Sequence, residues 1–548
     1  MTDVQVNKII ECFNELNITT TFSNNLFIVS TNINQIIIKM HCVIPSTFPY
    51  DFPVIFVSDD TYEKIIGIPH IYTDKSVCIF DKNKVIPNFM NPEGLIIETI
   101  LTAINIIKKG LNLENYDDYS DEFIEYWNSR IKLQMKSFVK FNDKCIILKY
   151  GIFDNDGFIA ETVDKVIKLA KTCYKNIENV EIKNCIYIPL IDKLKYPCPI
   201  TQKEWLNTFK FKSNYYKQYC QFIKNNKDKC SLILFSQNIN NALIICGFFH
   251  NCLPEVKGFR KGKTPVGVAL KGPAGNESIL KVIIKDISHD RLFLRGGIGI
   301  NINLSKVGII GCGSLGSFLA EGLANCGINE FTLIDNQLLT EENIARHYCG
   351  HRLLGFMKDN AVNIMLSEHN PNITCNTYHD DAHNILNNNI EILEKCDILF
   401  VTVGNAPLEH HIFDKIINEK IKIPVVILWV EPYAISGHAL IINKPQDVFS
   451  ELYDSNFSFK NNVVLNPDQY YKREVGCQST FIPYSGLDVK MFVFRFLEEY
   501  LNNYINKKNG NFHFTWIGNL SHLKKYVTHI NDCWKLMPDH SIYVERFD

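Results

Sequence analysis

The sequence predicts a multidomain chain in which an α+β domain and an α/β middle domain precede a C-terminal α/β domain with a parallel sheet. The length of 548 residues exceeds what one hydrophobic core usually serves. From Lys306 onwards a strand, a glycine loop, a helix and a second strand follow one another, which is typical of a parallel sheet covered by helices. We therefore expect domains over residues 1–136, 137–295 and 296–548.

The composition argues against several classes of protein. Hydrophobic residues make up 46% and charged residues 21% of the chain, and the net charge is −2, so we expect neither nucleic acid nor a membrane as a partner. The N-terminus lacks a secretory signal, and no stretch approaches about 18 uninterrupted apolar residues. The 18 cysteines include no C-x-x-C pair, which argues against zinc, and we expect a cytoplasmic protein.

The first domain has the pattern of a small α+β unit. Pro45, Pro49 and Pro53 exclude regular strand pairing and predict an ordered, extended loop. The middle domain alternates short β-rich runs with a basic segment over 257–263, and its pattern assigns it no chemistry. The N-terminal elements that we expect are helices over 4–16, 92–109 and 120–136 and strands over 25–31, 35–44 and 54–57.

A complete G-x-G-x-x-G unit connects the strand that starts at Lys306 to the helix that follows it, as in a Rossmann-like domain. Gly311 and Gly313 let backbone N–H groups approach a phosphate, and Gly316 permits close packing of the helix on the strand. Asp335 ends the next strand, where a carboxylate can bind ribose hydroxyls. This unit predicts a nucleotide but does not distinguish a dinucleotide from ATP.

The residues after Asp335 favour ATP. Asn343-Ile-Ala-Arg346 and then Gly355-Phe-Met-Lys358 follow it, and this order resembles the ThiF, MoeB and ubiquitin-activating superfamily. The resemblance implies that Arg346 and Lys358 neutralise the triphosphate and that Asn343 positions the phosphates or the metal. Cations also suit a carboxylate that attacks the α-phosphorus, whereas hydride transfer would not need them.

The metal ligands stay unknown. ATP implies Mg²⁺, yet the family's aspartate after the fourth strand is replaced by Gly404 in Val403-Gly404-Asn405. Asp397 begins that strand and suits the edge of the sheet better than the metal. Asp380 and Asp381 are alternative ligands.

Cys477 is the candidate acceptor of the activated acyl group. It lies in Arg473-Glu-Val-Gly-Cys477-Gln-Ser-Thr, shortly before an amphipathic helix over 489–500 whose dipole would favour a thiolate. A buried structural role for Cys477 and a competing nucleophile at Cys533 are the alternatives. We expect Cys312, inside the glycine loop, to be a packing residue.

The N-terminal domain resembles a ubiquitin-conjugating enzyme. The resemblance rests on the three spaced prolines, on Cys78 within Thr73-Asp-Lys-Ser-Val-Cys-Ile-Phe, and on Pro92-Glu-Gly-Leu before a helix. It implies that Cys78 carries a thioester, although a buried cysteine is the alternative. The family's histidine-proline-asparagine triplet is replaced by Pro69-His70-Ile71, so His70 either donates to the oxyanion or braces the loop.

The whole chain resembles the fused activating and conjugating proteins of type II CBASS anti-phage operons. The resemblance implies that ATP activates the C-terminal carboxylate of a cGAS-like nucleotidyltransferase, which passes from Cys477 to Cys78 and then to a target lysine. It also implies a homodimer and a middle domain that helps hold the partner. The alternatives are the same relay on a ubiquitin-like or sulfur-carrier protein, an NAD-dependent oxidoreductase, and a non-catalytic scaffold.

Overall fold

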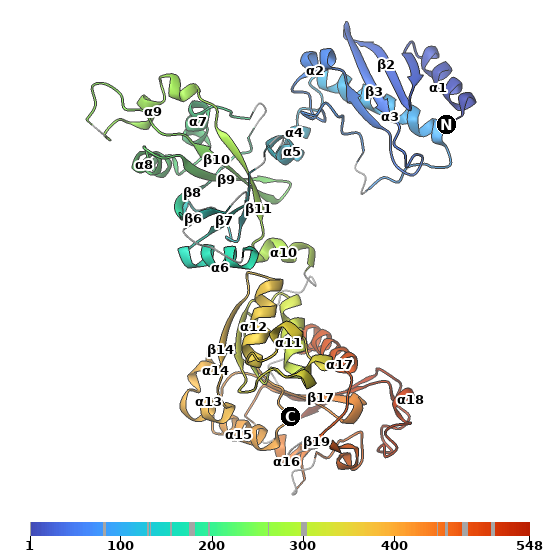
Figure 1. The fold of residues 1–548 in the computed structure, drawn as a ribbon, viewed down its shortest axis with the longest axis vertical. Helices are drawn as coiled ribbons and strands as arrows, with labels where there is room; N and C mark the ends of the chain where they lie inside the picture. The colour runs from blue at the N-terminus through green and yellow to red at the C-terminus, as the bar shows by residue number, and fades with distance from the viewer. Residues whose placement is uncertain are drawn as a thin grey trace. The chain divides into compact units, whose positions relative to one another are not determined.

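The computed structural model divides the chain into two compact units, Met1–Ile287 and Ser288–Asp548 (Figure 1). The structure describes residues 2–80, 84–128, 131, 133–153, 156–174, 181–194, 198–260, 262–296, 304–445, 448–454, 459–473, 480–505 and 510–547.

The first unit opens with a helix and a four-stranded antiparallel meander in the order β1-β2-β3-β4. Thr2 caps the first helix in a capping box with Gln5. Buried and exposed side chains alternate along β2 and β3, so one face of the sheet packs on the helices. The helix α1 (Asp3–Glu15) and the strands β2 (Leu26–Ile33), β3 (Ile36–Val43) and β4 (Val54–Val57) confirm the expected elements, whereas β1 (Thr19–Ser23) was not predicted.

Two helices complete this first domain. Asn91 caps the long helix α3, and Pro92 takes its first position, where a missing N–H costs no hydrogen bond. Ile96 and Ile100 of α3 are fully buried in one core with Phe27 and Met40 of the sheet. The bounds are α2 (Asp59–Ile65) and α3 (Pro92–Leu111).

The predicted helix over 120–136 is wrong. Two short helices, α4 (Asp118–Asp121) and α5 (Phe123–Asn128), are followed by strand β5 (Gln134–Ser137). Met135 and Ser137 are fully buried, and β5 pairs in parallel with β7 and β11. Pairing with distant strands therefore overrides the local helical pattern.

The rest of the first unit is a closed barrel in the order β10-β11-β5-β7-β6-β8-β9. An aromatic core that includes Trp127, Trp205, Phe235 and Phe248 packs where helices cover the barrel. The remaining elements are β6 (Ile146–Phe153), β7 (Asp156–Ala160), α6 (Val163–Cys173), β8 (Lys183–Pro189), α7 (Gln202–Lys212), α8 (Tyr216–Asn225), β9 (Ser231–Ile239), β10 (Ala242–His250), α9 (Val266–Ala269) and β11 (Leu280–Asp286).

The second unit is built on an eight-stranded sheet in the order β14-β13-β12-β15-β16-β17-β20-β21. The first five strands are parallel, and β17, β20 and β21 continue the sheet in antiparallel fashion. The strands are β12 (Lys306–Ile310), β13 (Glu330–Ile334), β14 (Thr374–Tyr378), β15 (Ile398–Val401), β16 (Val425–Val430), β17 (Ser436–Ile442), β20 (Asn511–Ile517) and β21 (Ile542–Phe547).

The topology of this sheet positions a crevice. Because β12 is flanked by β13 on one side and β15 on the other, the connections diverge at the carboxyl end of β12, where ligands bind in open α/β sheets. The glycine loop lies there. The helices are α10 (His289–Gly296), α11 (Ser314–Asn325), α12 (Lys358–His369), α13 (Ala382–Asn388), α14 (Glu391–Glu394), α15 (Ala406–Ile417), α16 (Val448–Leu452), α17 (Gly486–Glu499) and α18 (Leu520–Leu523).

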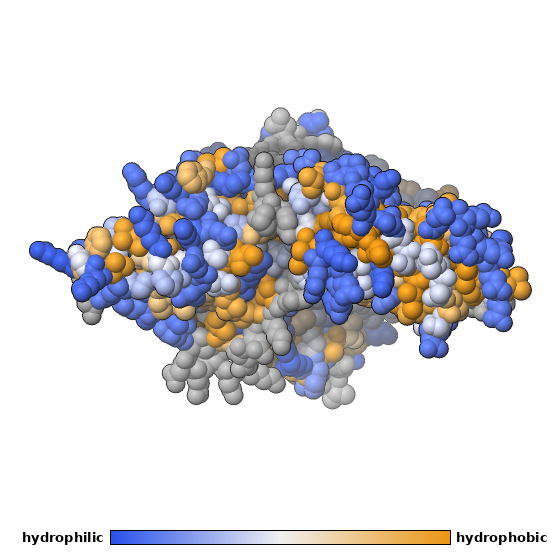
Figure 2. Space-filling view, turned by 90° about the horizontal axis from the view of Figure 1, so that it is seen from above, coloured by the Kyte–Doolittle hydropathy of each residue, from blue (hydrophilic) through white to orange (hydrophobic). Residues whose placement is uncertain are grey.

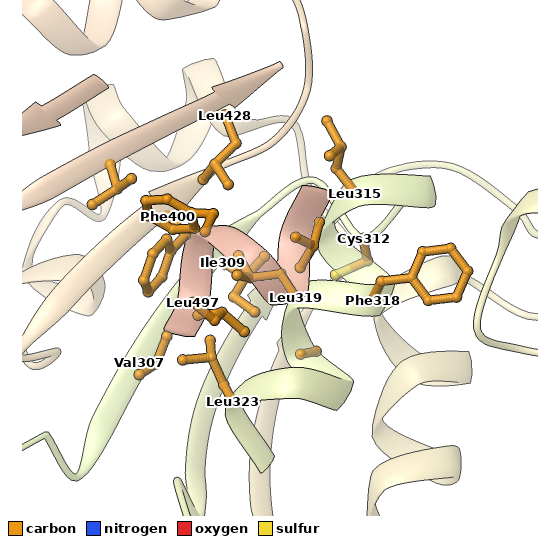
Figure 3. Close-up of a cluster of buried hydrophobic side chains, with 14 of the residues drawn as sticks. Val307, Ile309, Cys312, Leu315, Phe318, Leu319, Leu323, Phe400, Leu428 and Leu497 are labelled. Carbon is orange, nitrogen blue, oxygen red and sulfur yellow. The ribbon is translucent and has the colours of Figure 1, made fainter. Parts of the chain in front are cut away.

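The core of the second unit packs α11 and α17 against the sheet. Leu319 and Leu323 of α11 are fully buried against Phe400 of β15 and Leu497 of α17 (Figure 3). Cys312 lies in the same cluster and is buried, so the structure agrees with the expected packing role of this cysteine.

Within the described residues, no helix is both long and apolar enough to cross a bilayer. On the face that Figure 2 shows, hydrophilic and hydrophobic residues are interspersed.

A first prediction tests the packing of the glycine loop. A Cβ on Gly316 would lie 1.9 Å from the carbonyl oxygen of Gly311, a backbone atom that cannot move aside. We expect Gly316→Ala to destabilise the C-terminal unit by about 1–3 kcal/mol. Hydrogen exchange of peptides covering β12 and β13 in the full chain measures this change. Gly313→Ala is the control, since no atom lies within 4 Å of its Cβ position, and equal exchange in both variants would contradict the prediction.

Candidate functional site

The glycine loop leaves space above the start of α11. Gly311 has a φ of +91°, a conformation that glycine adopts readily. At Gly313, the N-cap residue of α11, an added Cβ would meet no protein atom within 4 Å, so the loop is open on that side. A phosphate can approach the free N–H groups of the helix through this opening.

Three side chains hold the loop in this shape. The carboxylate of Asp335 accepts from Cys312 N at 2.7 Å and from Gln337 N at 2.9 Å. Thr402 Oγ1 donates to Gly311 O at 2.6 Å. Burial lowers the pKa of His347 to about 4, so the ring is neutral. Its Nδ1 accepts from Cys349 N, and its Nε2 donates to Cys312 O at 2.7 Å.

Sequence reasoning missed His347 and Thr402. His347 directly follows Arg346, and Thr402 follows the strand that neighbours the glycine loop. A polar residue at the end of the strand next to a glycine loop can be recognised in the sequence, so a signal for Thr402 was available.

Four of the predicted nucleotide-binding residues line one cavity of about 390 Å³. Gly313, Asn343, Arg346 and Lys358 all face it, although they come from a loop, a short 3-10 helix and the start of α12. Asn343 Oδ1 accepts from Thr340 N at 3.1 Å, which closes the 3-10 turn. The structure therefore brings these four positions together.

The two cations are held differently. The Arg346 guanidinium lies 4.8 Å from the ring centre of Tyr484 and donates to Ile482 O at 3.5 Å. Lys358 is 7% exposed, and its Nζ donates to Gln337 Oε1 at 2.8 Å. Burial lowers the pKa of Lys358, while the charge of Asp335 opposes that shift. The Arg346 side chain is half-buried and that of Lys358 is buried, and both lie close to the open side of the glycine loop.

A second cavity of about 330 Å³ adjoins the first, since Gly313, Lys358 and Thr402 line both. Its walls combine Asp335 with apolar residues such as Ile334 and Leu408, which suits a ribose and a flat base. The residues that line the two cavities therefore suit ATP in their charge and polarity.

The fit of Mg²⁺ is less direct. Gly404 has a φ of +60° and offers no ligand, and among the described residues no carboxylate lines the cavity that contains Arg346. Asp380 and Asp381 line the second cavity. Both already accept hydrogen bonds, Asp380 from Asp381 N and Asp381 from His383 N. Asp397 accepts from Ser305 N and Lys306 N at the start of its strand, away from these carboxylates.

Cys477 lies outside the described residues. The chain on both sides of it is described: Arg473 in β18 (Lys472–Arg473) pairs with Thr480 in β19 (Thr480–Phe481). Ile482 and Tyr484 then line the cavity of Arg346. Cys533 is exposed.

In the first unit, Cys78 and His70 lie next to each other. Cys78 N donates to His70 O at 2.8 Å, and an isolated bridge joins Ile71 and Val77. The His70 backbone has a φ of +68°, in the left-handed region. An imidazole nitrogen of His70 lies within 4.8 Å of the Cys78 sulfur. Cys78 itself is half-buried and lines an open groove of about 1100 Å³.

Two carboxylates from the segment after α3 hold the ring of His70, and sequence reasoning missed both. Nδ1 of His70 lies 2.7 Å from Glu122 Oε1, and Nε2 lies 3.0 Å from Asp118 Oδ2. Tyr126 OH donates to Glu122 Oε2 at 2.7 Å and accepts from His70 N at 2.8 Å. Nothing in the local sequence connects these acids to a histidine about fifty positions earlier.

These contacts shift several pKa values. Hydrogen bonds to Cys78, Glu122 and Asp118 raise the pKa of His70 to about 10, although burial opposes them. Burial and a hydrogen bond to Cys78 raise the pKa of Tyr72. Burial would raise the pKa of Glu122, but its bonds from His70 and Tyr126 outweigh this effect and lower it. At neutral pH the centre therefore contains an imidazolium beside a cysteine and a carboxylate.

Comparisons with known proteins match both end domains. Residues 300–482 match the ThiF family, and residues 18–136 match prokaryotic E2 family B. A solved structure described as the crystal structure of SeMet PaaA aligns over 45% of this chain and 64% of its own, at 18% identity and a TM-score of 0.30. So low a score supports no argument.

Two curated proteins, each named ATP-dependent ubiquitin transferase-like protein Cap2, are similar to part of the chain. The protein from Vibrio cholerae is 25% identical over 34% of this chain and 33% of its own length. The protein from Enterobacter hormaechei is 36% identical over 16% of this chain and 15% of its own length. The matches thus span a third or less of these relatives.

Together the two domain matches and the similarity to Cap2 confirm the resemblance seen in the sequence. The chain joins a region that matches prokaryotic E2 family B to a region that matches the ThiF family in one polypeptide, and part of it is similar to two Cap2 proteins.

Proposed function

We propose that this protein uses ATP to activate the C-terminal carboxylate of a protein, carries the acyl group on two cysteines in turn, and joins it to an amine. The observation that carries the proposal is the convergence of Gly313, Asn343, Arg346 and Lys358 on one cavity. The matches to the ThiF family and to prokaryotic E2 family B in the same chain support it.

The first step is adenylation. A carboxylate oxygen attacks the α-phosphorus of ATP, the bond to pyrophosphate breaks, and an acyl adenylate forms. Arg346 and Lys358 stabilise the negative charge that builds up on the phosphates, which is the largest contribution a protein makes to such a reaction. Asp380 and Asp381, which line the linked cavity, would hold Mg²⁺, and the ion would supply further charge to neutralise the phosphates. The same cations disfavour the NAD-dependent alternative.

The second step is thioester transfer. The Cys477 thiolate attacks the acyl carbon and releases AMP, and Cys78 then takes the acyl group while Cys477 leaves as a thiolate. The described residues Ile482 and Tyr484, which follow Cys477 in the sequence, line the cavity of Arg346, and this supports the choice of Cys477 as the first acceptor.

The final step is attack by an amine on the Cys78 thioester. Lys109 and the four carboxylates Glu114, Asp118, Glu122 and Glu125 line the groove beside Cys78, and this excess of negative charge would attract a target lysine.

The partner follows from the resemblance to CBASS proteins. We propose the C-terminus of a cGAS-like nucleotidyltransferase as the activated carboxylate, with a ubiquitin-like or sulfur-carrier protein as the alternative. A cytoplasmic homodimer is the assembly we expect for the ThiF domain.

The relay predicts a sequence of trapped intermediates. Incubation with ATP, Mg²⁺ and the nucleotidyltransferase should give a thiol-sensitive adduct on a non-reducing gel. Cys477→Ala should abolish it, because the first acceptor is missing, and Cys78→Ala should leave the acyl group on Cys477. Cys533→Ala is the control and should behave as the wild type. An adduct that survives Cys477→Ala would exclude Cys477 as the first acceptor.

The cavity predicts a loss of adenylation in two variants. Arg346→Ala and Lys358→Ala should each lower ATP–pyrophosphate exchange by roughly 10²–10³-fold, since each removes a charge that stabilises the transition state. Arg352→Ala is the matched control, because Arg352 is 68% exposed and pairs with Glu368 instead. Exchange that stays within a factor of two in Arg346→Ala and Lys358→Ala would contradict an ATP site in this cavity.

A further inference from the structure

The conjugating site contains a cation that the relay leaves unused. The imidazole of His70, the sulfur of Cys78 and a carboxylate oxygen of Glu122 all lie within 4.8 Å of one another. His70 is 23% exposed and Glu122 14% exposed, so water screens this group only partly.

The contacts of His70 define its charge. Each ring nitrogen faces a carboxylate, Nδ1 that of Glu122 and Nε2 that of Asp118, so both nitrogens carry protons as donors. A doubly protonated ring is a cation. The other titratable groups around the ring and its groove are Tyr72, Tyr126, Lys109, Glu114 and Glu125.

We propose that His70 is a catalytic residue, the counter-cation of the Cys78 sulfur, and that Glu122 and Asp118 are positioning residues that keep it protonated and in place. The proposal rests on the conjugating role of Cys78 given above. A counter-cation role for His70 differs from a bracing role, because it requires a positive charge on the ring, whereas a neutral ring could brace the loop equally well.

The counter-cation acts when charge develops on sulfur. As Cys78 attacks the Cys477 thioester, its thiolate forms the new C–S bond, the old C–S bond breaks, and the electron pair leaves with the Cys477 sulfur. When an amine attacks the Cys78 thioester, the C–N bond forms and the electron pair returns to the Cys78 sulfur. The amine's surplus proton passes to solvent. His70 gives up no proton in either step, and its charge stabilises the Cys78 thiolate before the first step and after the second.

The carboxylates come from a segment anchored in the barrel. Trp127 of α5 is 1% exposed, and its ring centre lies 5.2 Å from that of Phe235 and 5.9 Å from that of Trp205. Its Nε1 donates to Val282 O at 3.3 Å, and Asn240 Nδ2 donates to Asp121 Oδ1 at 2.8 Å. The middle domain therefore helps to set the position of Glu122, which gives that domain a part in the conjugating site.

Alkylation of Cys78 tests this electrostatic contact without ATP or a partner. Full-length protein is treated with iodoacetamide between pH 6 and 10.5, and the tryptic peptide 76–82, whose only cysteine is Cys78, is quantified by mass spectrometry. At pH 7 we expect His70→Gln to react at least about tenfold more slowly than the wild type, because the variant lacks the charge that stabilises the thiolate. Glu122→Gln and Asp118→Asn should lie between the two.

Asp117→Asn is the matched control. Asp117 is an exposed carboxylate in the same segment and caps α4 without a side-chain hydrogen bond, so its profile should match the wild type within twofold. If Glu122→Gln fails to fold, Asp118→Asn still tests the positioning role. Asp118 is 47% exposed, so its replacement should leave the fold intact. Identical profiles for His70→Gln and the wild type would overturn the counter-cation. Wild-type profiles in both Glu122→Gln and Asp118→Asn would overturn the positioning roles.

The test separates this proposal from the relay. If the wild type forms no ATP-dependent adduct while His70→Gln still slows alkylation, the relay fails and the contact between His70 and Cys78 remains. If the adduct forms normally and His70→Gln alkylates as the wild type does, the relay remains and the counter-cation fails.

Discussion

The close approach of Gly316 to the carbonyl of Gly311 is the constraint on which the C-terminal site depends. The approach seats α11 against β12 and leaves the N-cap residue Gly313 facing open space. Asp335, His347 and Thr402 then fix the loop through its own backbone groups. These hydrogen bonds fix the loop without a ligand. A phosphate bound by the loop would therefore have a defined position relative to the two cations.

The site around Cys78 is assembled in a different way. Its cysteine and histidine are neighbours because a tight loop folds back on itself, with His70 in the left-handed region that histidine tolerates better than most residues. The groups that set the charge of His70 are Asp118 of α4 and Glu122, the C-cap residue of α4, and the next helix, α5, is anchored in another core. Local backbone geometry therefore brings the reactive pair together, and long-range packing sets its electrostatics.

This difference explains what the sequence could and could not predict. The glycine loop, Asp335, Asn343, Arg346 and Lys358 lie within one stretch of the chain, and their order carries the information. Glu122 and Asp118 have no such local signal, because their role arises only when Trp127 enters the barrel core. The same packing explains why residues 120–136 form two short helices and a strand in place of the expected helix, since β5 pairs with distant strands that no local sequence pattern indicates.

The two sites also differ in charge as their chemistry requires. The nucleotide cavity gathers Arg346 and Lys358 and, among the residues described, no carboxylate, which suits a polyanion. The groove of Cys78 holds four carboxylates against Lys109 and the imidazolium of His70, which suits an incoming amine. An uncompensated groove of that kind would repel a thiolate and slow acyl transfer. A cation between the carboxylates and the sulfur removes this conflict, because it lets the groove stay attractive to lysine while the charge on Cys78 is stabilised.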